Sequence, residues 1–324
     1  MDKIVVVQPI HSQGMKILSE AGEVIIPQNT SYHEISKVGR DAKALVVRLT
    51  NVSAELMDAL PSLKVIGRNG VGVDNIDVKA ASARKIMVVN TPGTNSNSVA
   101  EYVISAFMFL MKRLGSLDAH IRQGDWLYRD KCRGFDVEGK TIGIVGMGLI
   151  GSKLLKKCKT GLGMRTLVYD PYLSAEQIQQ SGAEACASLD LLLRQSDVVS
   201  IHVPLSQTTR GLFNKEVLSL MKKGAILVNA SRGGIVDEEA LVSLLQSGYL
   251  GGAALDVFEK EPPEIKSPIW ECPNLLATPH ISGMTEDAVI STAEAMCRDV
   301  AAVLRGDKPT NLYNWEAFEG VLLK

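Results

Sequence analysis

The stretch from Lys140 to Gly151 constrains the fold of this chain more than any other. Its first half, residues 141–145, is apolar and β-branched, which is typical of a buried parallel strand. Gly146, Gly148 and Gly151 follow in the spacing G-x-G-x-x-G, and helix-compatible residues come next. The first glycine permits a tight turn, the second lets a pyrophosphate approach the backbone, and the third lets helix and strand pack closely. This order predicts a dinucleotide-binding unit whose helix N-terminus faces the phosphates.

A carboxylate stands where such a unit holds the ribose hydroxyls of its ligand. Asp170 ends the next predicted strand, residues 165–170, about twenty residues after the last glycine. The same carboxylate would repel a 2′-phosphate, and Pro171 follows it where an NADP site favours an arginine. The sequence therefore predicts NAD as the cofactor.

Length and composition indicate two domains and exclude several classes of protein. The 324 residues are too many for a comfortable single core, and 46% hydrophobic with 22% charged residues is typical of globular proteins. The formal net charge of −1 gives no reason to expect nucleic acid or a membrane as a partner. The five cysteines are scattered without metal-ligand spacing, and no apolar stretch is long enough to span a membrane. We expect a cytoplasmic protein without a metal.

Alternating strands and helices run through the whole chain, which predicts parallel α/β sheets. A polar break with proline and glycine at residues 90–98 precedes an apolar segment, 99–114, that we interpret as one buried connecting helix. The last helical segment, 286–304, has no strand after it and is expected to return to the N-terminal domain.

The fold class predicted is therefore α/β with two doubly wound parallel-sheet domains. A Rossmann-type NAD domain over residues 98–284 is expected to be inserted into a discontinuous, flavodoxin-like substrate domain formed by residues 1–97 and 285–324.

Three short segments follow later strands, at the edge where open sheets bind ligands. Arg232 precedes two glycines, and its guanidinium could bind a carboxylate through two hydrogen bonds. The alternative is an ordinary surface arginine in a turn. Glu261 stands in an acidic loop stiffened by two prolines, although such loops are usually solvated. His280 follows a proline at a strand end.

These three side chains fit one reaction, the transfer of a hydride between nicotinamide and an α-carbon. That reaction needs a cation for the substrate carboxylate and a group that exchanges a proton near neutral pH, helped by a neighbouring carboxylate. A serine hydrolase is disfavoured because no G-x-S-x-G motif is present, and a metal site because the histidines are singletons.

Taken together, the motifs resemble those of the D-isomer-specific 2-hydroxyacid dehydrogenase family. The resemblance covers nearly the whole chain and rests on residues 146–151, 169–171, 228–237, 254–263 and 278–280. It implies an NAD-dependent dehydrogenase in which Arg232 anchors the substrate carboxylate, His280 is the acid/base and Glu261 is its partner. It also implies that Asp256 lies at the nicotinamide amide and that residues 117–131 form a dimerisation arm, hence a homodimer.

The resemblance further assigns the binding residues. For the cofactor they are Gly146, Gly148, Leu149, Ile150, Gly151, Asp170, His202, Pro204, Thr209, Ala230, Arg232, Asp256 and His280. For a small anionic 2-hydroxy acid we predict Arg48, Arg68, Asn69, Gly70, Val71, Gly72, Arg232 and His280, of which Arg48 and Arg68 are chosen because each follows a predicted strand.

Within the family, residues 67–77 together with Val47 and Arg48 look most like 3-phosphoglycerate dehydrogenases, and the end at Lys324 implies no regulatory domain. Val71 stands where those enzymes often carry threonine, so glyoxylate/hydroxypyruvate reductases and sulfolactate-type dehydrogenases remain alternatives. A non-enzymatic NAD-sensing corepressor is a further alternative.

The lead substrate, 3-phosphoglycerate, rests on two arginines. Arg48 and Arg68 each follow a predicted strand, and a second cationic centre suits an anionic C3 substituent such as phosphate or sulfonate. Alternatively, one arginine is solvated and the other pairs with Asp74 or Asp77.

Overall fold

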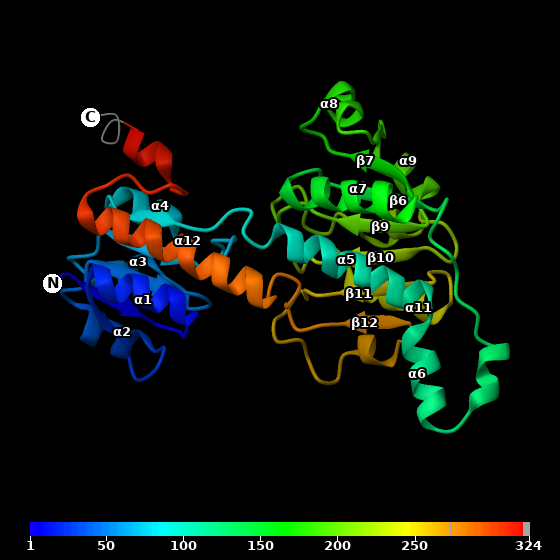
Figure 1. The fold of residues 1–324 in the computed structure, drawn as a ribbon, viewed down its shortest axis with the longest axis horizontal. Helices are drawn as coiled ribbons and strands as arrows, with labels where there is room; N and C mark the ends of the chain where they lie inside the picture. Colours follow the sequence, from blue (N-terminus) through cyan, green and yellow to red (C-terminus); the bar gives the residue numbers. More distant parts are fainter. Residues whose placement is uncertain (273, 320–324) are drawn as a thin grey trace. The chain divides into compact units, whose positions relative to one another are not determined.

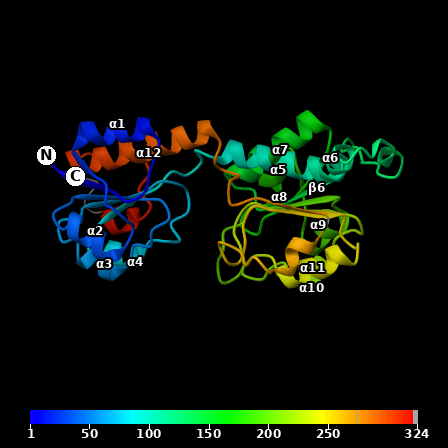
Figure 2. The same cartoon turned by 90° about the horizontal axis from the view of Figure 1, so that it is seen from below.

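The structure is a computed structural model that describes residues 1–272 and 274–319, and it divides the chain into two compact units. Unit 1 comprises Met1–Asn95 and Met284–Lys324, and unit 2 comprises Ser96–Gly283. Both are built from parallel strands with helices on the two faces of the sheet (Figures 1 and 2). The predicted fold class is confirmed, including the discontinuous first domain.

Unit 1 is a five-stranded sheet in the order β2-β1-β3-β4-β5, the flavodoxin-like arrangement. Its strands are β1 (Lys3–Val6), β2 (Glu23–Ile25), β3 (Ala44–Val47), β4 (Val65–Arg68) and β5 (Met87–Val89). Helices α1 (Ser12–Ala21) and α12 (Glu286–Arg305) cover one face, and α2 (Tyr32–Gly39), α3 (Ala54–Asp58) and α4 (Val78–Ala83) cover the other (Figure 2). A short 3-10 helix, η3 (Trp315–Phe318), follows.

Helix α12 is the element that returns to unit 1. Thr285 caps its N-terminus by accepting a hydrogen bond from the Ala288 amide, and Gly306 ends it in the left-handed region with φ +86°. A side chain at Gly67 of β4 would place its Cβ 2.6 Å from the Met296 sulfur. The glycine therefore lets a segment from the end of the chain pack directly on the sheet.

Unit 2 is a seven-stranded sheet in the order β12-β11-β10-β9-β6-β7-β8, the Rossmann arrangement extended by one strand. Its strands are β6 (Thr141–Val145), β7 (Arg165–Tyr169), β8 (Glu184–Ala185), β9 (Val198–Ile201), β10 (Ile226–Asn229), β11 (Gly252–Leu255) and β12 (Leu275–Ala277). Helices α5 (Ser96–Met111), α7 (Leu149–Leu162) and α8 (Ala175–Gln180) share one apolar cluster. Helices α9 (Leu189–Gln195), α10 (Lys215–Leu218) and α11 (Glu238–Gln246) share the other, and a 3-10 helix, η2 (Pro268–Glu271), follows β11.

The single connecting helix expected over residues 99–114 is wrong in extent. Helix α5 begins earlier, at Ser96, and ends at Met111, because Arg113 takes the left-handed conformation with φ 54°. The Met111 carbonyl, at the end of that helix, accepts a hydrogen bond from the Phe135 amide, 2.9 Å away. A separate helix α6 (Leu114–Arg122) and a 3-10 turn η1 (Trp126–Asp130) then form an arm that projects from the body of unit 2 (Figure 1).

The sequence predicted a strand over residues 64–66 with Arg68 beyond its end, whereas β4 extends to Arg68 itself. Among the described residues, no helix combines the length and apolar character that crossing a membrane would require.

Candidate active site

The glycine motif forms the turn between β6 and α7. Gly146 has φ +92°, and a Cβ at Gly151 would collide with the Gly146 carbonyl oxygen. Gly148 is the N-cap of α7, has open space where its Cβ would be, and caps the helix with no side chain. The N–H groups at this helix end are thus accessible to an anion, and the geometry fits the pyrophosphate of a dinucleotide.

Asp170 directly follows β7, and both of its carboxylate oxygens accept hydrogen bonds from the main chain. One carboxylate oxygen accepts the Met147 amide and the other accepts the Tyr172 amide, each at 2.9 Å. Each carboxylate oxygen can accept a further hydrogen bond. Asp170 therefore orders the glycine loop and still has acceptors for ribose hydroxyls.

The other cofactor residues predicted in unit 2 line the ends of β9 and β10 or the start of α7. The His202 ring nitrogen Nε2 lies 2.8 Å from the Ser200 hydroxyl, and burial lowers the pKa of this histidine to about 4. The Thr209 hydroxyl donates to the Pro204 carbonyl at 2.6 Å, which shapes that loop. Ala230 is buried directly after β10, whereas Leu149 is exposed and Ile150 half-buried at the start of α7.

Arg232 lies shortly after β10, and the side chain of Asn229 fixes the backbone there by hydrogen bonds. The Asn229 side-chain nitrogen Nδ2 donates to the Arg232 carbonyl at 3.0 Å, and the side-chain oxygen Oδ1 accepts from the Ser231 main-chain amide and hydroxyl at 3.1 and 2.8 Å. The Arg232 guanidinium donates to the Ser231 carbonyl at 2.8 Å. Sequence reasoning did not single out Asn229, although an asparagine two residues before a turn is the usual signal for this arrangement.

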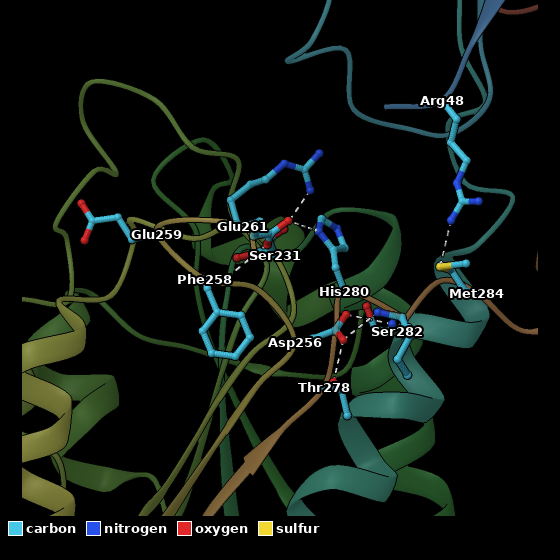
Figure 3. Close-up of polar contacts among 12 residues, drawn as sticks. Arg48, Ser231, Asp256, Phe258, Glu259, Glu261, Thr278, His280, Ser282 and Met284 are labelled. Carbon is cyan, nitrogen blue, oxygen red and sulfur yellow. Dashed lines mark hydrogen bonds and ion pairs between the residues drawn. The ribbon is translucent and has the colours of Figure 1, made fainter. Parts of the chain in front are cut away.

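His280 and Glu261 form a hydrogen-bonded pair, as the close-up in Figure 3 shows. The His280 Nδ1 lies 2.8 Å from Glu261 Oε2, and the other Glu261 oxygen accepts the Phe258 amide at 3.1 Å. Both side chains are partly exposed, at 48% and 40%. The ring nitrogen Nε2 makes no hydrogen bond to the described residues, so this atom can exchange a proton with a ligand.

His280 adopts a backbone conformation that a non-glycine residue uses rarely. Its φ is +55°, in the left-handed region, and its N–H donates to the carbonyls of Asp256 and Thr278 at 2.8 and 3.0 Å. Such conformations persist only where the surroundings impose them, and they cluster at functional sites.

Asp256 imposes that conformation from the end of β11. Its fully buried carboxylate accepts the Thr278 hydroxyl at 2.6 Å and the amides of Ile281 and Ser282, both at 2.8 Å (Figure 3). Thr278 is in turn 2.6 Å from the Tyr102 hydroxyl, and burial raises the pKa of that phenol to about 12. Asp256 therefore fixes the chain on both sides of His280.

The predicted substrate residues of unit 1 fall into two groups. Arg48 follows β3, its amide donates to the Gln8 side chain at 2.9 Å, and its guanidinium lies 3.6 Å from the Met284 sulfur. Arg68 donates to the Asn69 carbonyl at 2.7 Å and lies over Gly70, whose φ is +145°. The Arg68 side chain at the end of β4 thus lies over the first two residues of the loop that follows, Asn69 and Gly70.

The loop that follows β4 is held by hydrogen bonds from the segment that follows β5. The carbonyls of Gly70 and Val71 accept hydrogen bonds from the Thr91 amide at 3.1 Å and the Asn90 side chain at 2.7 Å. Val71 is exposed and Gly72 half-buried.

Across residues 1–272 and 274–319, no cluster of three or more histidine, cysteine, aspartate or glutamate side chains could hold a metal ion.

The chain resembles proteins of known family along nearly its whole length. Residues 104–282 match the model of the D-isomer specific 2-hydroxyacid dehydrogenase, NAD binding domain. The chain is 39% identical over 315 residues to a D-3-phosphoglycerate dehydrogenase of Methanocaldococcus jannaschii, which covers 97% of this chain and 60% of that protein. It is 38% identical over 328 residues to a glyoxylate reductase of Thermofilum pendens, with 98% of this chain and 96% of that protein covered.

A solved structure shares the whole fold. The TT0316 protein from Thermus thermophilus superposes with a TM-score of 0.87 and 34% identity, over 96% of this chain and 99% of that one. The chain spans about 60% of the length of the phosphoglycerate dehydrogenases that it matches first. The chain belongs to the D-isomer-specific 2-hydroxyacid dehydrogenase family, and unit 2 contains that family's NAD-binding domain.

Proposed function

We propose that the protein is an NAD-dependent oxidoreductase that interconverts a small 2-hydroxy acid and its 2-keto acid. The observation that carries the proposal is the pair of His280 and Glu261, 2.8 Å apart, on a loop that Asp256 holds in an uncommon conformation. A histidine oriented by a carboxylate is the arrangement that proton transfer to and from a substrate hydroxyl requires.

In this reaction each side chain has one task. NAD, whose pyrophosphate the glycine loop would hold, would supply or accept the hydride through its nicotinamide. Arg232 binds the C1 carboxylate through its planar guanidinium. The His280 Nε2 donates a proton to the carbonyl oxygen during reduction and takes it back during oxidation, while Glu261 stabilises the protonated ring. Asp256, whose oxygens already accept three hydrogen bonds within unit 2, acts mainly by positioning His280.

The lead substrate is the pair 3-phosphoglycerate and 3-phosphohydroxypyruvate. Arg48 and Arg68 of unit 1 are cations beside strand ends, and the loop at Asn69, Gly70, Val71 and Gly72 offers backbone groups. Two arginines favour a substrate with an anionic C3 group. Relatives named D-3-phosphoglycerate dehydrogenase and glyoxylate reductase are similarly close, so glyoxylate/hydroxypyruvate reduction and a sulfolactate-type reaction are the enzymatic alternatives.

A homodimer is the proposed assembly, formed through the arm of α6 and η1. Helix α6 buries none of its own residues, and the arm exposes a set of large apolar side chains: Leu114, Ile121, Trp126 and Leu127. The arm is internally ordered, because the rings of His120 and Tyr128 stack at 3.4 Å. Large exposed apolar groups of this kind are typical of interfaces between proteins.

The test is NADH oxidation with a panel of keto acids: 3-phosphohydroxypyruvate, sulfopyruvate, hydroxypyruvate and glyoxylate. We expect turnover with at least one of them and the highest kcat/KM for 3-phosphohydroxypyruvate. NADH binding without turnover of any member would instead favour an NAD-sensing, corepressor-like binding protein. A highest kcat/KM for glyoxylate would favour the reductase alternative.

A further inference from the structure

The loop that carries Glu261 is held by a second carboxylate outside the site described above. Glu238, the first residue of α11, accepts the Glu259 amide on Oε1 at 2.7 Å. Glu259 stands two residues before Glu261 and directly after Phe258, whose own amide donates to Glu261. The two hydrogen bonds fix successive peptide groups of one loop, the first to α11 and the second to the acid/base pair.

The same loop is also fixed from the segment that carries Arg232. A Cβ at Gly233 would collide with the Phe258 carbonyl oxygen and lie 2.7 Å from the Glu259 nitrogen. The peptide between Phe258 and Glu259 therefore rests directly on the Gly233 backbone. The chain from Arg232 to Glu238 and the loop before Glu261 thus pack as one body.

We propose that Glu238 is a positioning residue that keeps Glu261 in place against His280 by anchoring the Glu259 amide. The inference rests on the proposed function and extends it to a residue that does not contact the acid/base pair. Its effect on the reaction passes through Glu261 alone.

Two observations separate this role from ordinary helix capping. The N-cap position of α11 is already occupied by Asp237, which accepts the Ala240 amide at 3.0 Å. Glu239 supplies a second acid in the first turn and is exposed, so the helix dipole does not require Glu238. Glu238 is instead half-buried, and burial raises the pKa of its carboxyl, with the Glu259 carboxylate adding to the effect. Placing a carboxylate in such a site costs free energy that the Glu259 amide offsets.

The experiment compares Glu238→Ala with Glu238→Gln, which keeps a side-chain oxygen as acceptor, and with Glu239→Ala, which removes the neighbouring exposed charge. For Glu238→Ala we expect kcat to fall about tenfold, a part of the ~10²–10⁴-fold that a positioned acid or base contributes. The KM for NADH should stay unchanged, and the alkaline limb of the pH profile should move to lower pH. Glu238→Gln should recover most of the loss, and Glu239→Ala should behave as the wild type.

A double variant tests whether the effect passes through Glu261. In a Glu261→Gln background, Glu238→Ala should change kcat by less than about twofold, because residues that act as one unit are not additive. A tenfold loss in that background would overturn the proposal. Equal behaviour of Glu238→Ala and Glu239→Ala would overturn it as well.

The His280 ring also reports on the loop without turnover. Its titration, followed by NMR, should have a midpoint in Glu238→Ala that is displaced toward that of Glu261→Gln, and Glu239→Ala should leave it unchanged. If the wild type turns over none of the keto acids, the proposed function fails, while this midpoint still decides the role of Glu238. An unchanged midpoint in Glu238→Ala would refute that role.

Discussion

The strand ends of the two units hold their charged side chains in different ways. In unit 2, Asp170, Asp256 and Glu261 each accept hydrogen bonds from main-chain amides, so their oxygens are fixed by the fold itself. In unit 1, the Arg48 guanidinium contacts the Met284 sulfur, which is a weak acceptor. Unit 2 thus presents groups in fixed positions, whereas Arg48 can exchange a weak contact for a strong one with an anion.

The largest expected effect of a change in unit 2 is at the acid/base pair. His280→Ala should lower kcat by ~10²–10⁴-fold, the usual contribution of a positioned acid or base. Glu261→Gln should have a smaller effect and move the alkaline limb of the keto-acid reduction profile to lower pH, because reduction needs a protonated ring and the carboxylate favours that form. Steady-state rates from pH 5 to 10 measure both, with Glu259→Gln as the matched control on the same loop. If the alkaline limb does not move in Glu261→Gln, Glu261 does not stabilise the protonated His280 ring.

A second prediction concerns Asp170 and the choice between NADH and NADPH. Asp170→Ala should lower kcat/KM for NADH by about 10- to 100-fold, since each hydrogen bond to a charged group contributes ~1.5–3 kcal/mol. Asp170→Asn retains one acceptor oxygen but not the charge, so it should lose less with NADH and gain activity with NADPH. Wild-type enzyme that uses NADPH as well as NADH would contradict the assignment of NAD.

In unit 1 the arginines provide the complementary test. If they bind an anionic C3 substituent, Arg48→Ala or Arg68→Ala should lower kcat/KM for 3-phosphohydroxypyruvate by about tenfold, as expected for one lost charge-assisted hydrogen bond. The value for glyoxylate, which has no C3 group, should change little. Arg40→Ala, on the exposed C-cap of α2, is the control for the loss of a positive charge. Equal losses with both substrates would show that the arginines do not discriminate between them.

The smallest effect concerns the stability of unit 2 at low pH. The pKa of His202 is about 4 in the folded protein and the ordinary value is 6.5, so between these values the unfolded chain takes up a proton that the folded chain does not. Stability should therefore fall as the pH decreases through this window, by about 1 kcal/mol at pH 5.5. His202→Gln should lack this loss in urea denaturation at pH 7.5 and 5.5, and His33→Gln, an exposed site, should retain it. Parallel losses in the wild type and His202→Gln would show that the His202 ring is not the cause.

Much of this molecule follows from local sequence patterns. Short apolar strands alternating with helices determine a parallel α/β architecture, because no other arrangement buries both faces of such strands. The spacing of Gly146, Gly148 and Gly151 determines the phosphate-binding turn, since two of these positions leave no room for a side chain. Asp170 and the segments that carry Arg232, Glu261 and His280 could also be identified from the sequence, because each of them stands at the end of a predicted strand.

Only the tertiary structure decided how those side chains are held. Glu261 meets His280 across nineteen residues of sequence, and Glu238 reaches Glu259 across twenty-one. The left-handed conformation of His280 likewise depends on a distant segment, because its N–H donates to the Asp256 carbonyl. Periodicity and propensity describe neighbours in sequence, whereas these contacts exist only after the sheet has brought the ends of β10, β11 and β12 to one edge.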